Sequence, residues 1–314
     1  MSDKTIPHFN YIITIHNKQD LIENVVLSVI KCMGPCSNLY AALDGCTDNS
    51  EKIIDQLIIN YPNYKIHKIF TEDVHELKTI NAGLRAANQD GTGFNIILQD
   101  DVILQDINLE RNITTLYERD EKMGIVSLRH GGNLSKRLLF KKNFYYPIKD
   151  YTENEKGHNP NLISMLPLGS FTYREIVIKS PVCIPFTVIR SVGLPDERFA
   201  PWDDIAYCYC VSEAGFNNGV FALDFISEVA WGTSRSKAQK VSISTVHIKN
   251  IALFIELFGN KIKNRKMRPI YSKKIFQIFD SPEKQKISPA KFARGLRDHL
   301  LNIARYNYTI LLKK

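Results

Sequence analysis

The chain has 314 residues, of which 44% are hydrophobic and 24% are charged, and its formal net charge is +8. This composition is ordinary for a globular protein and excludes disorder over most of the length. No apolar run approaches the ~20 residues that cross a bilayer, and no signal-peptide core follows Met1, so we expect a cytoplasmic protein.

Strands and helices alternate along the first 130 residues. Apolar, β-branched and aromatic residues predict strands at 9–16, 39–43, 64–70 and 94–98. Between these strands, apolar residues spaced three and four apart predict helices at 21–30, 53–58 and 77–87. This alternation implies a parallel sheet with right-handed crossovers. The sequence therefore predicts an α/β fold, with a mixed, mostly parallel sheet flanked by helices.

The pattern changes in the rest of the chain. A helix at 107–117 and a strand at 124–128 continue the alternation, and further elements are predicted as a strand at 182–189, a helix opened by Asp203 and a strand at 220–223. Residues 130–180 mix Gly, Asn and Pro with short apolar runs, which indicates a loop-rich insertion that carries acceptor contacts. We expect a catalytic domain over 1–235 and a basic helical C-terminal extension over 236–314.

Carboxylates follow two of the predicted strands. Asp44 ends one, and Asp100 and Asp101 follow another; parallel strands present their carboxyl ends at one edge, so these side chains should converge. We expect Asp203 and Asp204, at a helix start, to join them. Such acids hold a hard cation or remove a proton from a hydroxyl group. The alternatives are that they only form turns or stabilise the first turn of a helix.

Five stretches, in order, carry a resemblance to a known family. They are residues 9–17, the Asp-Gly-Cys-Thr-Asp run within 43–50, the Asn-Ala-Gly helix at 78–84, Gln99 to Asp101, and 193–216. From Phe9 to about Phe221 the chain resembles the inverting glycosyltransferases of family 2, which have the GT-A, or nucleotide-diphospho-sugar transferase, fold. In that family the fourth stretch is the Asp-x-Asp motif, and the fifth surrounds a Glu-Asp catalytic base.

The resemblance implies roles for individual residues. Asp204 would be the general base, Asp101 would ligate Mn²⁺ or Mg²⁺, and Asp44 would bind the nucleobase. The other implied substrate contacts are His16, Asn17, Lys78, Asn81, Asp100, Trp202 and Asp203. Lys78 is alternatively a solvated helix charge, and Asn81 a residue that fixes the loop preceding the predicted strand at 94–98.

Two departures from the family pattern concern the metal. Gln99 replaces the first acid of Asp-x-Asp, and an uncharged amide oxygen holds a cation more weakly than a carboxylate. Relatives often supply a later His, and the first one after the predicted strand at 220 is His247. We keep both Gln99 and His247 as candidate metal ligands, with an ordinary helix residue as the alternative for His247.

The implied reaction moves a hexosyl or N-acetylhexosaminyl group, with inversion, from a nucleotide-diphosphate donor to an acceptor hydroxyl. A UDP-sugar is the first choice of donor and a glycan or lipid-linked glycan the acceptor, in cell-surface polysaccharide or lipopolysaccharide synthesis. Two other classes stay open. A sugar nucleotidyltransferase would want a Gly-rich phosphate loop, which residues 16–19 are not. A non-catalytic sugar-nucleotide-binding protein is suggested by Gln99.

The C-terminal residues 261–314 hold 15 Lys and Arg against 3 Asp and Glu, which leaves 26 basic and 30 acidic residues in 1–260. Within this tail an apolar helical face is formed by Phe292, Leu296, Leu300 and Ile303. Such a segment binds an anionic membrane surface, which would make the protein peripheral on the cytoplasmic face. Packing on the body and homo-oligomer formation are alternatives. We expect no nucleic-acid binding, because no nucleic-acid module accompanies the charge.

Overall fold

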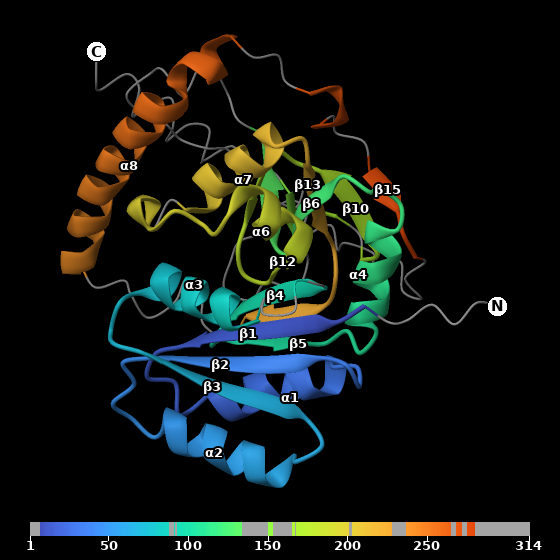
Figure 1. Ribbon diagram of the computed structural model, residues 1–314, viewed down its shortest axis with the longest axis vertical. Coiled ribbons are helices and arrows are strands. Elements are labelled where there is room, and N and C mark those ends of the chain that lie inside the picture. Colours follow the sequence, from blue (N-terminus) through green and yellow to red (C-terminus); the bar gives the residue numbers. More distant parts are fainter. Residues whose placement is uncertain are drawn as a thin grey trace, which may run out of the picture.

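The computed structural model describes residues 7–87, 91, 93–133, 150–152, 165–166, 168–200, 203–227, 237–264, 268–271 and 275–279. A nine-stranded sheet runs through the centre in the order β15-β10-β13-β6-β12-β4-β1-β2-β3, with helices on both faces (Figure 1). Among the described residues, no helix combines the length and the hydrophobicity that crossing a membrane requires.

The first part of the chain forms the parallel part of this sheet. β1 (Phe9–Ile15) lies between β2 (Asn38–Asp44) and β4 (Phe94–Gln99), β3 (Lys65–Thr71) follows β2, and all three pairings are parallel. The crossovers are the helices α1 (Ile22–Cys32), α2 (Ser50–Asn60) and α3 (Glu76–Ala87). In Figure 1, α1 and α2 cover one face and α3 covers the other. The predicted parallel α/β arrangement is confirmed.

The second part is mixed. β5 (Val102–Leu104) and α4 (Leu109–Tyr117) lead to β6 (Met123–Ser127), and β12 (Val182–Pro185) lies antiparallel between β4 and β6. β13 (Asn217–Phe221) is parallel to β6, and β10 (Ser170–Tyr173) is antiparallel to both β13 and β15 (Ile275–Gln277). β14 (Phe225–Ser227) pairs with β5.

One sequence prediction was wrong in this region, and another stays a prediction. The loop-rich insertion expected over 130–180 is described only in part, and the described residues include short strands. Of these, β7 (His130–Gly132), β8 (Asp150–Thr152), β9 (Met165–Leu166) and β11 (Ile176–Ile178) make a four-stranded sheet, and β10 joins the central one. Strands of two to four residues are too short to show an alternating pattern.

The strand predicted over 182–189 ends at Pro185, where the helix α6 (Phe186–Val192) begins. Val188 and Ile189 are β-branched, which favours a strand locally, but both are buried against the core in a helix. Here tertiary packing outweighs local propensity.

The C-terminal elements pack on the body. α7 (Asp203–Glu213) is followed, after β13 and β14, by α8 (Lys237–Asn264). The Asn250 side chain of α8 donates to the carbonyls of Phe199 and Ala200, both at 2.9 Å. The other described elements are the short helices η2 (Glu197–Phe199) and η3 (Pro269–Tyr271). The apolar face expected from Phe292 to Ile303 lies outside the described residues.

Candidate active site

Residues at the ends of three neighbouring strands lie at one edge of the sheet: His16 after β1, Asp44 at the end of β2, and Asp100 and Asp101 after β4. The parallel register pairs Ile15 with Leu43 and Thr14 with Gln99, so the residues that follow each strand meet at one edge of the sheet. His16 Nδ1 lies 2.7 Å from the carbonyl oxygen of Asp44, and the His16 amide donates to Asp100 Oδ2 at 2.9 Å. We refer to these four residues as the strand-end group.

Asp44 is fixed by uncharged donors. It is buried, and its Oδ1 accepts hydrogen bonds from the Val74 amide at 3.0 Å and from Thr71 Oγ1 at 3.1 Å. Gly45 follows with φ 54°, and a Cβ there would come within 2.7 Å of the Asp73 amide nitrogen. Only glycine therefore allows the close approach that brings Asp73 beside His16 and Asp44, with one ligand atom of each within 4.8 Å of the others.

Asp100 and Asp101 give this edge two adjacent carboxyl groups. Burial raises the pKa of Asp100 to about 6, although the His16 amide and the charge of Lys18 act in the opposite direction. Lys18 Nζ lies 3.4 Å from Asp100 Oδ1. Asp101 is 5% exposed and accepts a hydrogen bond from Ser227 Oγ of β14 at 3.1 Å. The β5–β14 pairing thus orients the predicted metal ligand.

The expected substrate contacts on the first loop and on α3 differ in their surroundings. Asn17 is exposed, and its Oδ1 accepts from the amides of Thr47 at 2.8 Å and Asp48 at 3.3 Å, so it shapes the loop after β2. Lys78 is exposed on α3.

Asn81 packs against the turn before α7. It is 1% exposed, and its Nδ2 donates to the Pro195 carbonyl at 2.9 Å and to Glu197 Oε1 at 3.0 Å. Through these bonds the side chain holds that turn against α3, which is a different segment from the loop before β4 that the sequence alternative named. The substrate contact expected of Asn81 stays a prediction.

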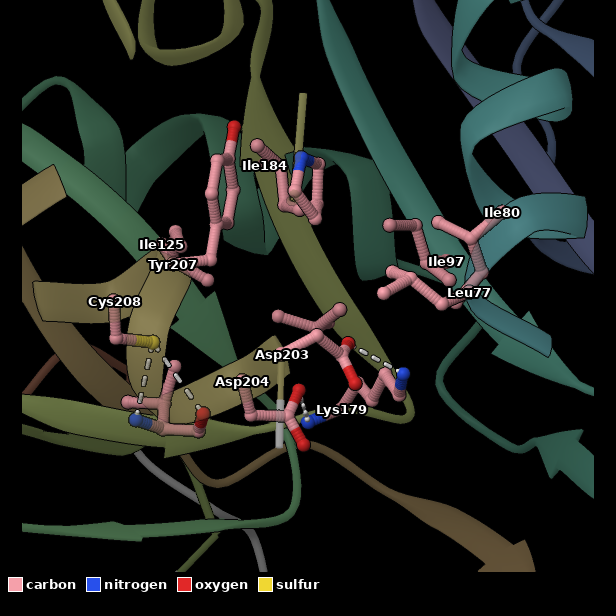
Figure 2. A pocket seen from close by; sticks show the side chains of 13 residues that line it. Leu77, Ile80, Ile97, Ile125, Lys179, Ile184, Asp203, Asp204, Tyr207 and Cys208 are labelled. Carbon is pink, nitrogen blue, oxygen red and sulfur yellow. Dashed lines mark hydrogen bonds and ion pairs between the residues drawn. The ribbon is translucent and has the colours of Figure 1, made fainter. Parts of the chain in front are cut away.

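A second cluster surrounds one lysine. Asp203 and Asp204 open α7; Lys179 Nζ lies 2.6 Å from Asp203 Oδ2 and 3.9 Å from Glu76 Oε2, and the Lys179 amide donates to Asp204 Oδ1 at 3.3 Å. Figure 2 shows both aspartates directed toward Lys179. We refer to Glu76, Lys179, Asp203 and Asp204 as the lysine group.

Enclosure changes the proton affinities in the lysine group. Burial raises the pKa of the Asp204 carboxyl well above its usual value, the negative charge of Asp203 raises it further, and Lys179 opposes both effects. Burial alone would lower the pKa of Lys179, but the neighbouring carboxylates raise it above its ordinary value. The cluster therefore holds an ammonium group and at least one carboxyl group that takes up a proton readily.

Gln99 connects the two groups. Its side-chain Nε2 donates to Glu76 Oε1 at 2.8 Å, and its backbone amide donates to Ser180 Oγ at 2.7 Å. A path of direct contacts and chain neighbours thus leads from Asp44 through Asp100 and Gln99 to Lys179 and Asp204. Because Nε2 is used by Glu76, any contribution of Gln99 to a cation must come from Oε1.

A narrow pocket of about 30 Å³ lies beside the lysine group. Aliphatic side chains of α3, β4, β6 and β12 line it together with Lys179, Asp203 and Asp204 (Figure 2). Asp203 is 4% exposed, and its Oδ1 has no hydrogen-bond partner within the described part of the chain. This volume accommodates about one water molecule, so a sugar ring has to bind outside the pocket.

Sequence reasoning missed Glu76 and Lys179. Glu76 has the pattern of an ordinary first-turn acid of α3, and Lys179 lies at the end of the stretch that was interpreted as loops. Of the remaining candidates, Trp202 lies outside the described residues. His247 belongs to α8, but its side chain is outside the described part of the structure.

Comparisons with known proteins agree with this architecture. A family model described as "Glycosyl transferase family 2" matches residues 11–179. No curated protein sequence matches the chain significantly.

Three solved structures show the same fold. The mannosyltransferase PcManGT from Pyrobaculum calidifontis, in complex with GDP-Man and Mn²⁺, has a TM-score of 0.55 and 14% identity over 85% of this chain and 68% of its own. S. aureus TarS 1-349 in complex with UDP has a TM-score of 0.50 and 15% identity, over 81% of this chain and 69% of its own. GalNAc-T7 with UDP, GalNAc and Mn²⁺ has a TM-score of 0.59 and 13% identity over 83% of this chain, which spans only 50% of GalNAc-T7.

Proposed function

Because this chain belongs to glycosyl transferase family 2, we propose that it is a metal-dependent, inverting glycosyltransferase that uses a nucleotide-diphosphate sugar. The observation that carries the proposal is the contact path that joins the strand-end group to the lysine group along one edge of the sheet. Ligands of open α/β sheets bind outside the carboxyl ends of the strands, which is where both groups lie.

The strand-end group would bind the nucleotide. Asp44 is held by Thr71 and Val74 through Oδ1, so its position is set before any ligand arrives. It would accept a hydrogen bond from the base, with His16 and Asp100 beside it. Asn17 would act by holding the loop after β2 in place.

The same edge fits a hard cation. Mg²⁺ and Mn²⁺ prefer oxygen ligands, which Asp101, Asp100 and Gln99 Oε1 supply, and the Ser227 hydroxyl orients the Asp101 carboxylate. When bound there, such a cation neutralises charge on the departing diphosphate. We propose Asp101 as the principal ligand and keep Gln99 and His247 as candidates. The Mn²⁺ in the PcManGT and GalNAc-T7 structures supports a cation in the reaction, although their identities to this chain are low.

Asp204 would be the general base that takes the proton of the acceptor hydroxyl as it attacks the anomeric carbon. A general base works best when its pKa lies near the working pH, and the raised pKa of Asp204 moves it in that direction. Asp203 is engaged by Lys179 at 2.6 Å, whereas Asp204 accepts only the backbone amide of Lys179 among the described residues. Direct attack opposite the diphosphate gives inversion.

The finer identity of the substrates is also a proposal. UDP in the TarS and GalNAc-T7 structures supports a UDP-sugar as the first donor to test, with hexosyl or N-acetylhexosaminyl transfer. We propose a glycan or lipid-linked glycan acceptor, in the synthesis of a cell-surface polysaccharide or lipopolysaccharide. A cytoplasmic protein that contacts the membrane through its basic tail fits such an acceptor. The boundary at residue 235, between the catalytic domain and the basic C-terminal extension, remains a prediction.

The test is a panel of nucleotide sugars assayed by thermal shift and by donor hydrolysis, each with and without Mn²⁺. One donor should raise the melting temperature and be hydrolysed only when the cation is present, and Asp101→Asn should remove both effects. Asp55→Asn is the matched control, because Asp55 pairs with Lys68 away from this edge. Binding without hydrolysis would indicate a non-catalytic sugar-nucleotide-binding protein, and no response to any donor would contradict the proposal.

A further inference from the structure

Lys179 touches every acid of the lysine group. Its ammonium group lies 2.6 Å from Asp203 and 3.9 Å from Glu76, and its backbone amide donates to Asp204 at 3.3 Å. Only 13% of its side chain is exposed. Removing a lysine from water is unfavourable unless opposite charges surround it. The acids therefore stabilise the charged Lys179 in this position, and the charge of Lys179 in turn reduces the net negative charge of the group.

The two aspartates are held differently. Asp203 is buried, is directly paired with the ammonium group, and lines the small pocket. Asp204 is only part-buried and is held by the Lys179 amide, which every residue except proline provides. Two carboxyl groups this close cannot both ionise easily unless a cation offsets one of them. The ion pair with Asp203 provides that cation next to Asp204.

We propose that Lys179 is a positioning residue of the transfer reaction: by pairing with Asp203 it fixes one aspartate and leaves Asp204 as the acid that exchanges the acceptor proton. This inference rests on the proposed function, because it assigns a role around the proposed base. Lys179 does not touch the reacting atoms in this role; it acts through the charge and position of its neighbours.

The charged groups around Asp204 support these separate roles of Asp203 and Asp204. The groups that face it are Asp203, Tyr207 and Cys208 on α7, Glu76 on α3, and Lys179 on the segment between β11 and β12. Of these, Asp203 and Glu76 raise the pKa of Asp204, and Lys179 is the one that lowers it. Burial raises the pKa of the Cys208 thiol, so Cys208 stays neutral.

The test is the pKa of the Asp204 carboxyl in the full-length protein without substrate. It is measured from the pH dependence of the ¹³C NMR signal, which Asp204→Asn identifies. Lys179→Met should raise this pKa by about one to three units, the usual effect of a neighbouring opposite charge. Asp203→Asn should lower it, and Lys179→Arg should leave it near the wild-type value.

Activity gives a second readout that a purely structural lysine would not change. With Mn²⁺ and an accepted donor, the acid limb of the kcat profile should move upward in Lys179→Met, with kcat recovering at high pH and KM for the donor unchanged. Lys68→Met is the matched control, since Lys68 also pairs with two carboxylates, at 2.9 and 2.6 Å, but on β3. It should alter neither readout.

Two outcomes decide against the proposal. A raised donor KM with an unmoved acid limb would make Lys179 a ligand of the donor. An Asp204 pKa that is unchanged in Lys179→Met would overturn the proposal whatever Asp203→Asn does, because losing the Asp203 charge lowers this pKa with or without Lys179. If Lys179→Met does not fold, Lys179→Gln removes the same charge and is titrated in its place. If no donor is turned over, the proposed function fails, while the NMR titration still tests Lys179.

Discussion

Asp44 and Asp101 of the strand-end group are held in a different way from the acids of the lysine group. Neutral donors contact them, namely the Val74 amide and the hydroxyls of Thr71 and Ser227, whereas Asp100 beside them lies 3.4 Å from the Lys18 ammonium group. In the lysine group one ammonium group lies among three acids and offsets part of their charge. In the proposed function, the first arrangement suits the binding of a cation, and the second suits the transfer of a proton.

The largest expected effect is on the lysine group, where we propose that the acceptor proton is taken up. Asp204→Asn should lower kcat by about 10²–10⁴, the usual contribution of a general base, because an amide cannot take the acceptor proton. Initial rates with the accepted donor and Mn²⁺ measure it. Glu213→Gln is the control, since Glu213 is exposed at the other end of α7. Full activity in Asp204→Asn would remove this residue from the mechanism.

Asp101→Asn tests the strand-end group, where we propose that the cation binds. Losing one charged ligand should weaken donor binding in Mn²⁺ at least tenfold, about 1.4 kcal/mol, and leave metal-free binding unchanged. Titration calorimetry with and without Mn²⁺ separates the two. Ser227→Ala removes only the hydrogen bond that orients Asp101, so its effect should be smaller. Equal donor affinity in wild type and Asp101→Asn would show that the cation binds elsewhere.

The pH dependence of stability sharpens the comparison. The pKa of Asp204 is raised in the folded state, so between its unfolded value and that raised value the folded protein binds more protons than the unfolded chain. The stability contribution is complete below the unfolded pKa and is lost as the pH rises through the folded one. Denaturant unfolding at several pH values should show this loss in wild type. The loss should be smaller in Asp204→Asn, where only the contribution of Asp100 and other unchanged groups remains; parallel curves for both proteins would contradict the shift.

Asn81 belongs to neither group, and its removal should change the stability of the protein without a comparable change in donor binding. Asn81→Ala removes two hydrogen bonds to the turn at 195–197 and should lower the free energy of unfolding by about 1–3 kcal/mol. Lys78→Ala, an exposed neighbour on the same helix, is the control and should change stability little. Donor affinity should be retained in Asn81→Ala. A selective loss of donor binding with normal stability would support Asn81 as a substrate contact.

The strand-end group could be predicted from the sequence, because its position follows from local sequence patterns. Apolar runs located β1, β2 and β4, and adjacent parallel strands must end at the same edge, which brings His16, Asp44 and Asp100 together. The family pattern added Asp204, and α7 does open with Asp203 and Asp204.

The lysine group could not be predicted from the sequence, because long-range packing brings its residues together. Lys179 lies between the short strands β11 and β12, and no spacing in the sequence connects it with Glu76 on α3 or Asp203 on α7. Periodicity likewise places Asn81 on a helix without showing that its buried amide meets a turn more than a hundred residues later. Local sequence identifies the elements, and their packing decides which polar side chains meet.

The most direct test of the central claim is a crystal structure of the protein with Mn²⁺ and the nucleotide sugar that it accepts. The anomalous signal of the cation should lie against the Asp101 carboxylate, with the nucleotide beside Asp44 and the anomeric carbon facing Asp204. A cation or nucleotide bound away from this edge of the sheet, or a sugar with Asp204 on its far side, would contradict the account.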